Sequence, residues 1–243
     1  MKILAIESSS MVASVAITDN NTLVAEYTIN HKKTHSQTLL PMIDEIVKMT
    51  ETSLETVDAI AVSAGPGSFT GLRIGSATGK GIGLALDIPM IHIPTMDALA
   101  YNLYGCKDMI CPIMDARRNQ VYTGLYEFDG EDFHIIQSQE LMQIEELIAR
   151  INSMGRKVMF LGDGVDTLSS YIMENIAVEY HFAPVHMNKN KASSVAALAQ
   201  VYYKEGKIEN AREHLPDYLR ESQAERELKE KMVQNDGNKQ NDC

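Results

Sequence analysis

The sequence predicts an α/β fold made of two lobes, each built in the order βββαβαβα. Apolar runs of strand length alternate with amphipathic stretches of helix length along the 243 residues. The same order of elements occurs twice, although the two halves share no residue-level repeat. The chain therefore divides into two successive units, followed by a short charged tail.

The first unit covers residues 1–105. It opens with three apolar or alternating runs that we expect to form a meander of antiparallel strands. A helix with one apolar face follows, and Thr34 or Ser36 can cap it. Buried strands and helices then alternate. The expected strands are 2–7, 12–18, 22–29, 57–64 and 88–93, and the expected helices are 36–49, 70–86 and 95–104.

The second unit covers residues 106–220 and repeats this order. Its last helix, within 192–206, is a candidate to pack back on the first lobe. Residues 221–243 are charged with almost no apolar face, so we expect a disordered tail. The expected strands are 109–116, 120–128, 133–138, 157–161 and 177–182, and the expected helices are 142–153, 165–175 and 192–204.

Two βββαβαβα units in tandem are typical of the duplicated actin-like (ASKHA; actin, hexokinase and Hsp70) architecture. Each lobe of that fold holds a twisted mixed sheet with helices on both faces. Because fold does not determine chemistry, this prediction leaves open both an enzyme and a binding subunit.

Composition excludes several classes of function. The net charge of −11 argues against a large nucleic-acid footprint formed by this chain alone, although not against a subunit of an RNA-handling assembly. The N-terminal run is too short for a signal peptide, and no apolar run has the length of a membrane span. The three cysteines are odd in number and lack zinc-finger spacing. We therefore expect a cytoplasmic protein with reduced thiols and no membrane contact.

Seven of the fifteen glycines lie between residues 65 and 83. Four of them, Gly71, Gly75, Gly79 and Gly83, recur every fourth residue and would share one face of the helix at 70–86. Each glycine inside a helix costs about 1 kcal/mol relative to alanine. A bare glycine face allows another backbone to approach closely, so we expect this face to contact a partner helix or a ligand.

The loop before this helix resembles a phosphate cradle but has neither the G-x-G-x-x-G nor the P-loop spacing. Arg73 lies in the first turn of the helix, where a cation opposes the helix dipole. We expect Arg73 to meet an acidic partner group or an anion. The alternative is a bridge to a surface carboxylate of the same chain.

Glu7 ends the first strand and precedes Ser8 and Ser9. In actin-like kinases an acidic residue at this place lies near the nucleotide phosphates and magnesium, and a serine turn can bind phosphate. Glu7, Ser8 and Ser9 are therefore candidate nucleotide or phosphate residues. An ordinary turn after a strand explains them equally well.

Other polar motifs favour structural roles. His31 and His35 have the spacing of a helical metal pair, but they lie at a strand end with no nearby carboxylate. The segment 162–164 (Gly-Asp-Gly) occupies the place where this architecture often meets adenine, and a two-glycine turn is the favoured interpretation. The segment 115–118 (Asp-Ala-Arg-Arg) fits either a cleft or a charged turn. No nucleophile elbow is present, so we predict no catalytic residue.

Several motifs together resemble the TsaB (YeaZ) family across residues 1–220. The most specific is Gly-Pro-Gly-Ser-Phe-Thr-Gly-Leu-Arg-Ile-Gly at 65–75. The supporting motifs are Ala-Ile-Glu-Ser-Ser at 5–9, His-Ser-Gln-x-Leu-Leu-Pro at 35–41, Asp-Ala-Arg at 115–117, Gly-Asp-Gly at 162–164 and Pro-Asp-Tyr-Leu-Arg at 216–220.

The resemblance implies an actin-like fold and a role in making threonylcarbamoyladenosine in tRNA. It implies a non-catalytic scaffold that pairs with its catalytic paralogue TsaD and the ATPase TsaE, meets tRNA only through that complex, and forms a homodimer alone. ATP and magnesium would be used by the complex, with no cofactor intrinsic to this chain. The alternative is an actin-like ATP-dependent phosphotransferase, favoured by architecture and Glu7 alone.

The resemblance also implies which residues pair. We expect the helices at 36–49 and 70–86 to form a close interface with the partner. The expected partner-binding residues are His35, Leu39, Met42, Gly71, Arg73, Gly75, Gly79 and Gly83. TsaD carries a His-x-x-x-His metal pair where this chain has Thr95 and Leu99, which cannot replace imidazole ligands. We therefore expect no metal site in this chain.

Overall fold

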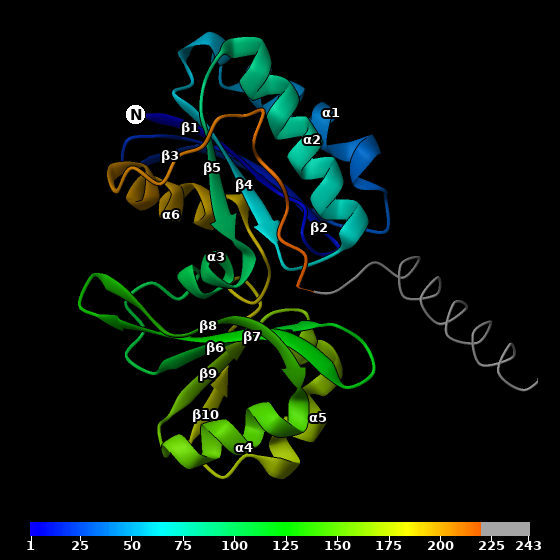
Figure 1. Cartoon of the computed structure of the whole chain (residues 1–243), viewed down its shortest axis with the longest axis vertical. Helices are drawn as coiled ribbons and strands as arrows, with labels where there is room; N and C mark the ends of the chain where they lie inside the picture. The colour runs from blue at the N-terminus through cyan, green and yellow to red at the C-terminus, as the bar shows by residue number, and fades with distance from the viewer. Residues whose placement is uncertain (220–243) are drawn as a thin grey trace, which may run out of the picture.

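The computed structural model, which describes residues 1–219, contains two five-stranded sheets, one in each lobe (Figure 1). The strand orders are β3-β2-β1-β4-β5 and β8-β7-β6-β9-β10, so the two lobes share one topology. In each sheet the first three strands pair antiparallel and the last two join in parallel. The predicted duplicated actin-like fold with mixed sheets is therefore confirmed. The tail at 221–243 lies outside the described residues.

The first lobe follows the predicted order, with a short 3-10 turn at Leu54–Thr56 added. The central strand β4 is buried at every residue and β1 at all but its first, whereas the edge strand β3 is largely exposed. The burial of β1 and β4 explains why these central strands have almost no polar residues. The elements are β1 (Lys2–Glu7), β2 (Val12–Asp19), β3 (Thr22–Asn30), α1 (His35–Met49), β4 (Ala59–Gly65), α2 (Phe69–Leu86), β5 (Met90–Pro94) and α3 (Thr95–Tyr101).

The second lobe differs from expectation mainly in one strand, which continues five residues beyond the predicted 138. Register shifts near Thr123 let this strand stay paired with its neighbour as far as Gln143. The next helix therefore begins at Ile144. The elements are β6 (Met109–Asp115), β7 (Gln120–Asp129), β8 (Asp132–Gln143), α4 (Ile144–Met154), β9 (Val158–Leu161), α5 (Gly164–Asn175), β10 (Tyr180–Phe182) and α6 (Ala192–Lys204).

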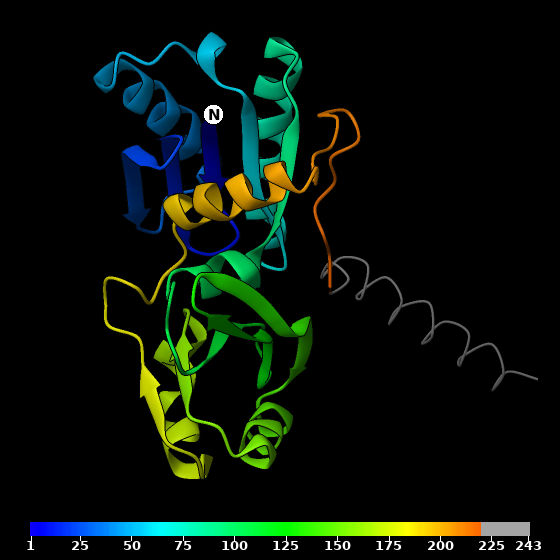
Figure 2. The ribbon, with the colours of Figure 1, turned by 90° about the vertical axis from the view of Figure 1, so that its left-hand side faces the viewer.

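The last helix of each unit packs on the other lobe. Helix α6 lies against β1 and β2, where its small residues join a core cluster with Ile3 and Ile91. Helix α3 lies between the lobes and packs on β6 and β7 through Met96 and Leu99 (Figure 2). The sheet of the first lobe is thus covered by α1 and α2 on one face and by α6 on the other.

The chain after α6 also returns to the first lobe. We call residues 207–219 the C-terminal strap, which runs beside α2 and β5 (Figure 1, orange). Glu209 and Met90 exchange two backbone hydrogen bonds of 2.9 Å, and the Asp217 amide donates to Ala64 O at 2.7 Å. The motif at 216–220 lies in this segment, but local sequence does not predict its path, because its contacts lie more than a hundred residues away along the chain.

The glycine face of α2 points into the lobe, so the expectation that it meets a partner is wrong. A Cβ at Gly79 would lie 2.7 Å from Val62 Cγ2, and one at Gly83 would lie 3.1 Å from Ala211 Cβ. A Cβ at Gly71 or Gly75 would overlap Ser8. The surface that approaches the glycines is the chain's own sheet, its serine turn and its strap.

Alanine substitutions at two glycines of α2 test this packing. Gly79→Ala should lower the free energy of unfolding by about 1–3 kcal/mol, because its Cβ meets the rigid Val62 side chain. Gly81→Ala should raise it by up to about 1 kcal/mol, because nothing lies within 4 Å of its Cβ and alanine favours the helix. Urea unfolding measures both. Equal effects at the two positions would contradict an inward glycine face.

Candidate functional site

Most of the predicted partner-binding residues lie inside the chain. Leu39 and Met42 belong to the core between α1 and the sheet, and the four glycines of the α2 face are buried. The His35 ring is also buried, with its Nε2 2.9 Å from Ser10 O and its Nδ1 without a hydrogen-bond partner. Arg73 alone among the eight predicted partner-binding residues is exposed. Direct contact of the other seven with a partner is therefore not supported, because they form the inner faces of α1 and α2.

The outer surfaces of these two helices are apolar in places. Leu40 of α1 is 57% exposed and Leu84 of α2 is 48% exposed. Ala77, Gly81 and Ala85 are also exposed and offer little bulk along α2. The two helices lie side by side at one end of the molecule (Figure 1). We call their exposed residues the α1–α2 outer face.

Arg73 contacts aromatic rings instead of the acidic group that we expected. Its guanidinium carbon lies 4.0 Å from the Phe69 ring centroid, and its Nε donates to the Tyr218 hydroxyl at 3.1 Å. Within residues 1–219, no ion pair involves Arg73. The side chain therefore joins α2 to the C-terminal strap, and the alternative of a bridge to a carboxylate of the same chain is not supported among residues 1–219 either.

The Glu7 carboxyl is fully buried and has its hydrogen-bonding capacity in use. Its Oε1 accepts from the Ser9 amide at 2.6 Å and from the Ser9 hydroxyl at 2.5 Å. Its Oε2 is hydrogen-bonded to the Ser63 hydroxyl. Burial raises the pKa of Glu7 above 4.5, and these hydrogen bonds oppose that rise. The side chain is thus poorly suited to hold a cation.

The serine turn and the glycine-rich loop pack directly on each other. The Ser68 amide donates to Ser9 O at 2.6 Å, and a Cβ at Gly67 would overlap the same carbonyl. The two loops are therefore in direct backbone contact, with no room for a ligand between Gly67 and Ser9. Glu7, Ser8 and Ser9 are thus hydrogen-bonded within the chain, a geometry that agrees with the alternative of an ordinary turn.

The remaining motifs have structural partners. A Cβ at Gly164 would lie 2.7 Å from Ile113 Cγ2, so the glycines at 162 and 164 let the start of α5 pack on β6. The Asp115 carboxylate accepts from the Arg117 amide at 2.6 Å within its own turn. The two positions that correspond to a metal pair in TsaD are interior: the Thr95 hydroxyl accepts from the Gly65 amide, and Leu99 lies in the core.

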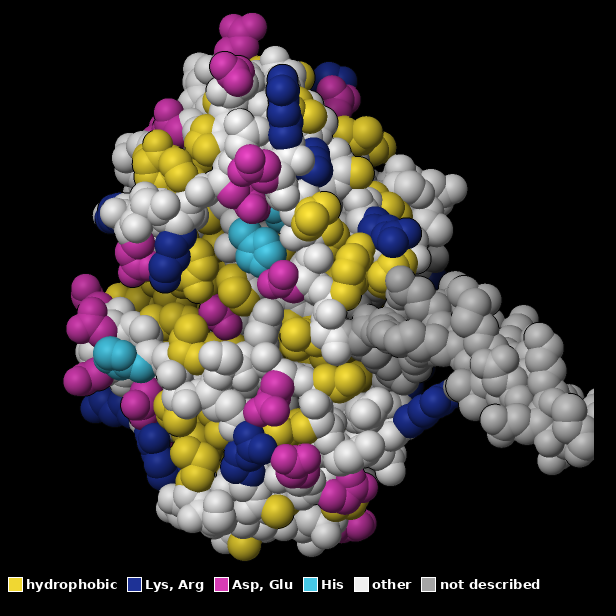
Figure 3. Space-filling view, in the orientation of Figure 1, with side chains coloured by type: hydrophobic (Ala, Val, Ile, Leu, Met, Phe, Trp, Pro, Cys, Tyr) yellow, Lys and Arg dark blue, Asp and Glu magenta, His cyan; other side chains and the backbone are white. Residues whose placement is uncertain are grey.

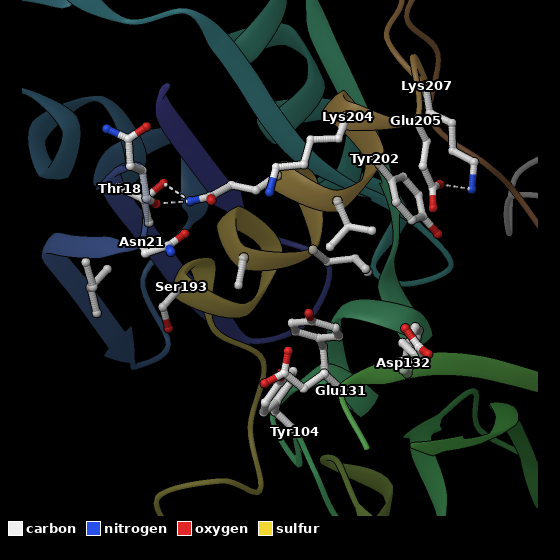
Figure 4. A pocket seen from close by; sticks show the side chains of 18 of the residues that line it. Thr18, Asn21, Tyr104, Glu131, Asp132, Ser193, Tyr202, Lys204, Glu205 and Lys207 are labelled. Carbon is white, nitrogen blue, oxygen red and sulfur yellow. Dashed lines mark hydrogen bonds and ion pairs between the residues drawn. The ribbon is translucent and has the colours of Figure 1, made fainter. Parts of the chain in front are cut away.

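A cavity of about 830 Å³ opens between the lobes, away from the serine turn. It lies between the β2–β3 turn, α3, the β7–β8 turn and α6 (Figure 4). Tyr104, Tyr202 and Lys204 line it, and Lys207 lies over the Tyr202 ring with its Nζ 4.4 Å from the centroid. No predicted site residue contributes to this cavity.

Sequence reasoning missed a cluster of titratable side chains at the strap. His92 of β5 meets Glu209, His214 and Asp217, which lie more than 110 residues later in the chain. Burial lowers the pKa of His214, and the Glu209 carboxylate opposes that change. No local spacing could have revealed this cluster, because only the path of the strap brings its members together.

Comparison with known proteins decides the family. A family model described as TsaD, tRNA N6-adenosine threonylcarbamoyltransferase, matches residues 22–228. A Bacillus subtilis (strain 168) relative, named tRNA threonylcarbamoyladenosine biosynthesis protein TsaB, is 30% identical over 93% of this chain and 96% of its own. The chain belongs to the TsaB (YeaZ) family.

A second relative agrees with TsaB membership, and a solved structure agrees with the fold. An Escherichia coli (strain K12) relative of the same name is 31% identical over 68% of this chain and 72% of its own. The solved structure of YeaZ from Pseudomonas aeruginosa has the same fold, with a TM-score of 0.78 at 24% identity, over 90% of this chain and 99% of that one. None of the described helices is long and apolar enough to cross a membrane.

The raised pKa of Glu7 gives a pH-dependent test of its environment. An acid whose pKa is higher in the folded state contributes stability below its unfolded pKa of about 4.5, and that contribution is lost as the pH rises through the folded value. Glu7→Gln cannot ionise and can keep the hydrogen bonds of the neutral carboxyl. The melting temperature of Glu7→Gln relative to wild type should therefore increase from pH 4.5 to pH 8. A difference that falls over this range would show that Glu7 is held as an anion.

Proposed function

We propose that this TsaB-family chain is a non-catalytic subunit of the cytoplasmic assembly that makes threonylcarbamoyladenosine in tRNA. The names of the relatives and the match to the TsaD transferase model support this role. The observation that carries it is the interior placement of Thr95 and Leu99, which leaves no ligand pair where TsaD has one. The chain would therefore act by binding, and its paralogue TsaD would catalyse the reaction.

The proposed contact with TsaD is the α1–α2 outer face. Exposed leucines beside small residues allow a second helix pair to approach closely and bury apolar surface. The same face would pair two copies of the chain when TsaD is absent. TsaE would join this assembly and not the isolated chain. The net charge of −11 supports contact with tRNA through the complex only.

We propose further that ATP and magnesium serve the complex and that this chain holds no cofactor of its own at the serine turn. The hydrogen-bonded Glu7 and the backbone contact between the loops support this view. The second candidate, an ATP-dependent phosphotransferase, is favoured by the actin-like architecture alone, and its expected acidic residue is hydrogen-bonded to Ser9 and Ser63.

A charged residue on the α1–α2 outer face should weaken association with TsaD without affecting folding. Leu84→Glu should weaken association with TsaD at least tenfold, about 1.4 kcal/mol, because it places a carboxylate in an apolar contact. Met173→Glu is the matched control, since Met173 is 52% exposed but lies on α5 of the other lobe. Sedimentation of mixtures measures pairing, and threonylcarbamoyl transfer to tRNA measures function.

The chain alone should give no transfer, and the Leu84→Glu variant should depress transfer by the reconstituted set while melting at the wild-type temperature. Transfer by the isolated chain would refute the subunit assignment. Equal pairing by the Leu84→Glu and Met173→Glu variants would instead move the interface to another surface and leave the subunit role standing.

A further inference from the structure

We propose that His92, Glu209 and His214 form a binding site for one zinc-type divalent metal ion, which clamps the C-terminal strap to the first lobe. One potential ligand atom from each residue lies within 4.8 Å of the other two. Two imidazoles and one carboxylate are ligands that Zn²⁺ takes in protein sites. The inference is independent of the proposed role in tRNA modification.

The two imidazoles present the same ring atom to one carboxylate oxygen. Nδ1 of His92 lies 4.0 Å from Glu209 Oε1, and Nδ1 of His214 is hydrogen-bonded to that oxygen. A tetrahedral metal at about 2.0–2.2 Å from each atom would hold the donors roughly 3.3–3.6 Å apart. The His214–Glu209 pair would therefore separate slightly, and His92 Nδ1 would move closer to Glu209 Oε1. The histidine rings meet edge to face with centroids 5.7 Å apart, so both face the same space.

The outer nitrogen of each ring already has a second partner. Nε2 of His92 lies 2.9 Å from Asp217 Oδ2, and Nε2 of His214 lies 3.0 Å from Ser76 Oγ. Histidines that bind metals usually donate their other ring N–H to a carboxylate or another acceptor, which fixes the tautomer and the ring orientation. Both rings are thus oriented as ligands through Nδ1.

The backbone holds the three ligands in place. Glu209 pairs with Met90 on the edge of β5, two residues before His92. Lys80 of α2 donates to His214 O at 2.9 Å and to Arg212 O at 3.0 Å. Lys80 therefore places one positive charge beside His214, and the carboxylates of Glu209 and Asp217 bring two negative charges. The donor atoms therefore converge without a large movement of the chain.

The site is open to solvent on one side. His92 and Glu209 leave 27% and 28% of their side chains exposed, and Glu209 also lines a cavity of about 450 Å³ between α2 and the strap. Figure 3 shows histidine side chains at the surface on this face of the molecule, beside acidic side chains. A metal could therefore enter, and three protein ligands would leave a fourth position for water or for a partner's side chain.

Zinc titration of the full chain tests the site. The protein is purified without a polyhistidine tag, stripped with a chelator and titrated with ZnCl₂ in a calorimeter. We expect one equivalent to bind and the melting temperature to rise with zinc. His92→Gln should abolish that binding and the rise, and Asp217→Asn should weaken binding by about 10–100-fold. His92 is partly exposed, so this variant should fold where a change at the buried His214 could fail.

His181→Gln is the matched control. His181 also faces a carboxylate, with Nε2 3.9 Å from Glu179 Oε1, but this pair is exposed on the second lobe. It should bind zinc as the wild type does. The proposal is overturned if no stoichiometric zinc binds, or if His92→Gln and His181→Gln bind zinc equally, which would leave only adventitious surface binding.

Discussion

The close approach of α2 to the central strands of the first lobe is the constraint on which the rest of the structure depends. Gly71 and Gly75 let this helix lie on Ser8, and Gly79 lets it lie on the side chains of β4, where a Cβ would collide. Gly83 faces Ala211 of the strap, where a Cβ would be tightly packed. The combined helix cost of the four glycines, roughly 3–4 kcal/mol, is offset by burial of the sheet beneath. A helix with side chains at these positions would stand further from the sheet.

This approach has two consequences for function. It brings the glycine-rich loop into backbone contact with Ser9, and the Glu7 carboxyl is hydrogen-bonded to Ser9 and Ser63. It also leaves the opposite side of α2, with Leu84 and small residues, as an exposed surface beside α1. The glycines of α2 thus account both for the contact of the glycine-rich loop with Ser9 and for the exposed outer side of α2. These two features agree better with the proposed subunit role than with a kinase.

Most of the fold could be predicted from the sequence, because strand and helix periodicities are local. The fourfold glycine spacing is visible in the sequence, but it does not predict whether the glycine face of the helix contacts a partner or the chain's own sheet. The partner-binding roles expected of His35, Leu39 and Met42 are not supported for the same reason, since a motif identifies residues and not the side of the helix they occupy. The strap, its contact with Arg73 and the cluster at His92 could not be predicted, because they depend on a return of the chain after α6.

Nucleotide binding by the isolated chain is the most direct test of the central claim, that packing of α2 closes the phosphate position. Calorimetric titration with ATP and magnesium should give no stoichiometric binding, because Glu7, Ser8 and Ser9 are engaged with the chain itself. Binding of one equivalent of ATP that requires magnesium would contradict the account. It would show that the glycine loop and the serine turn separate to admit phosphate.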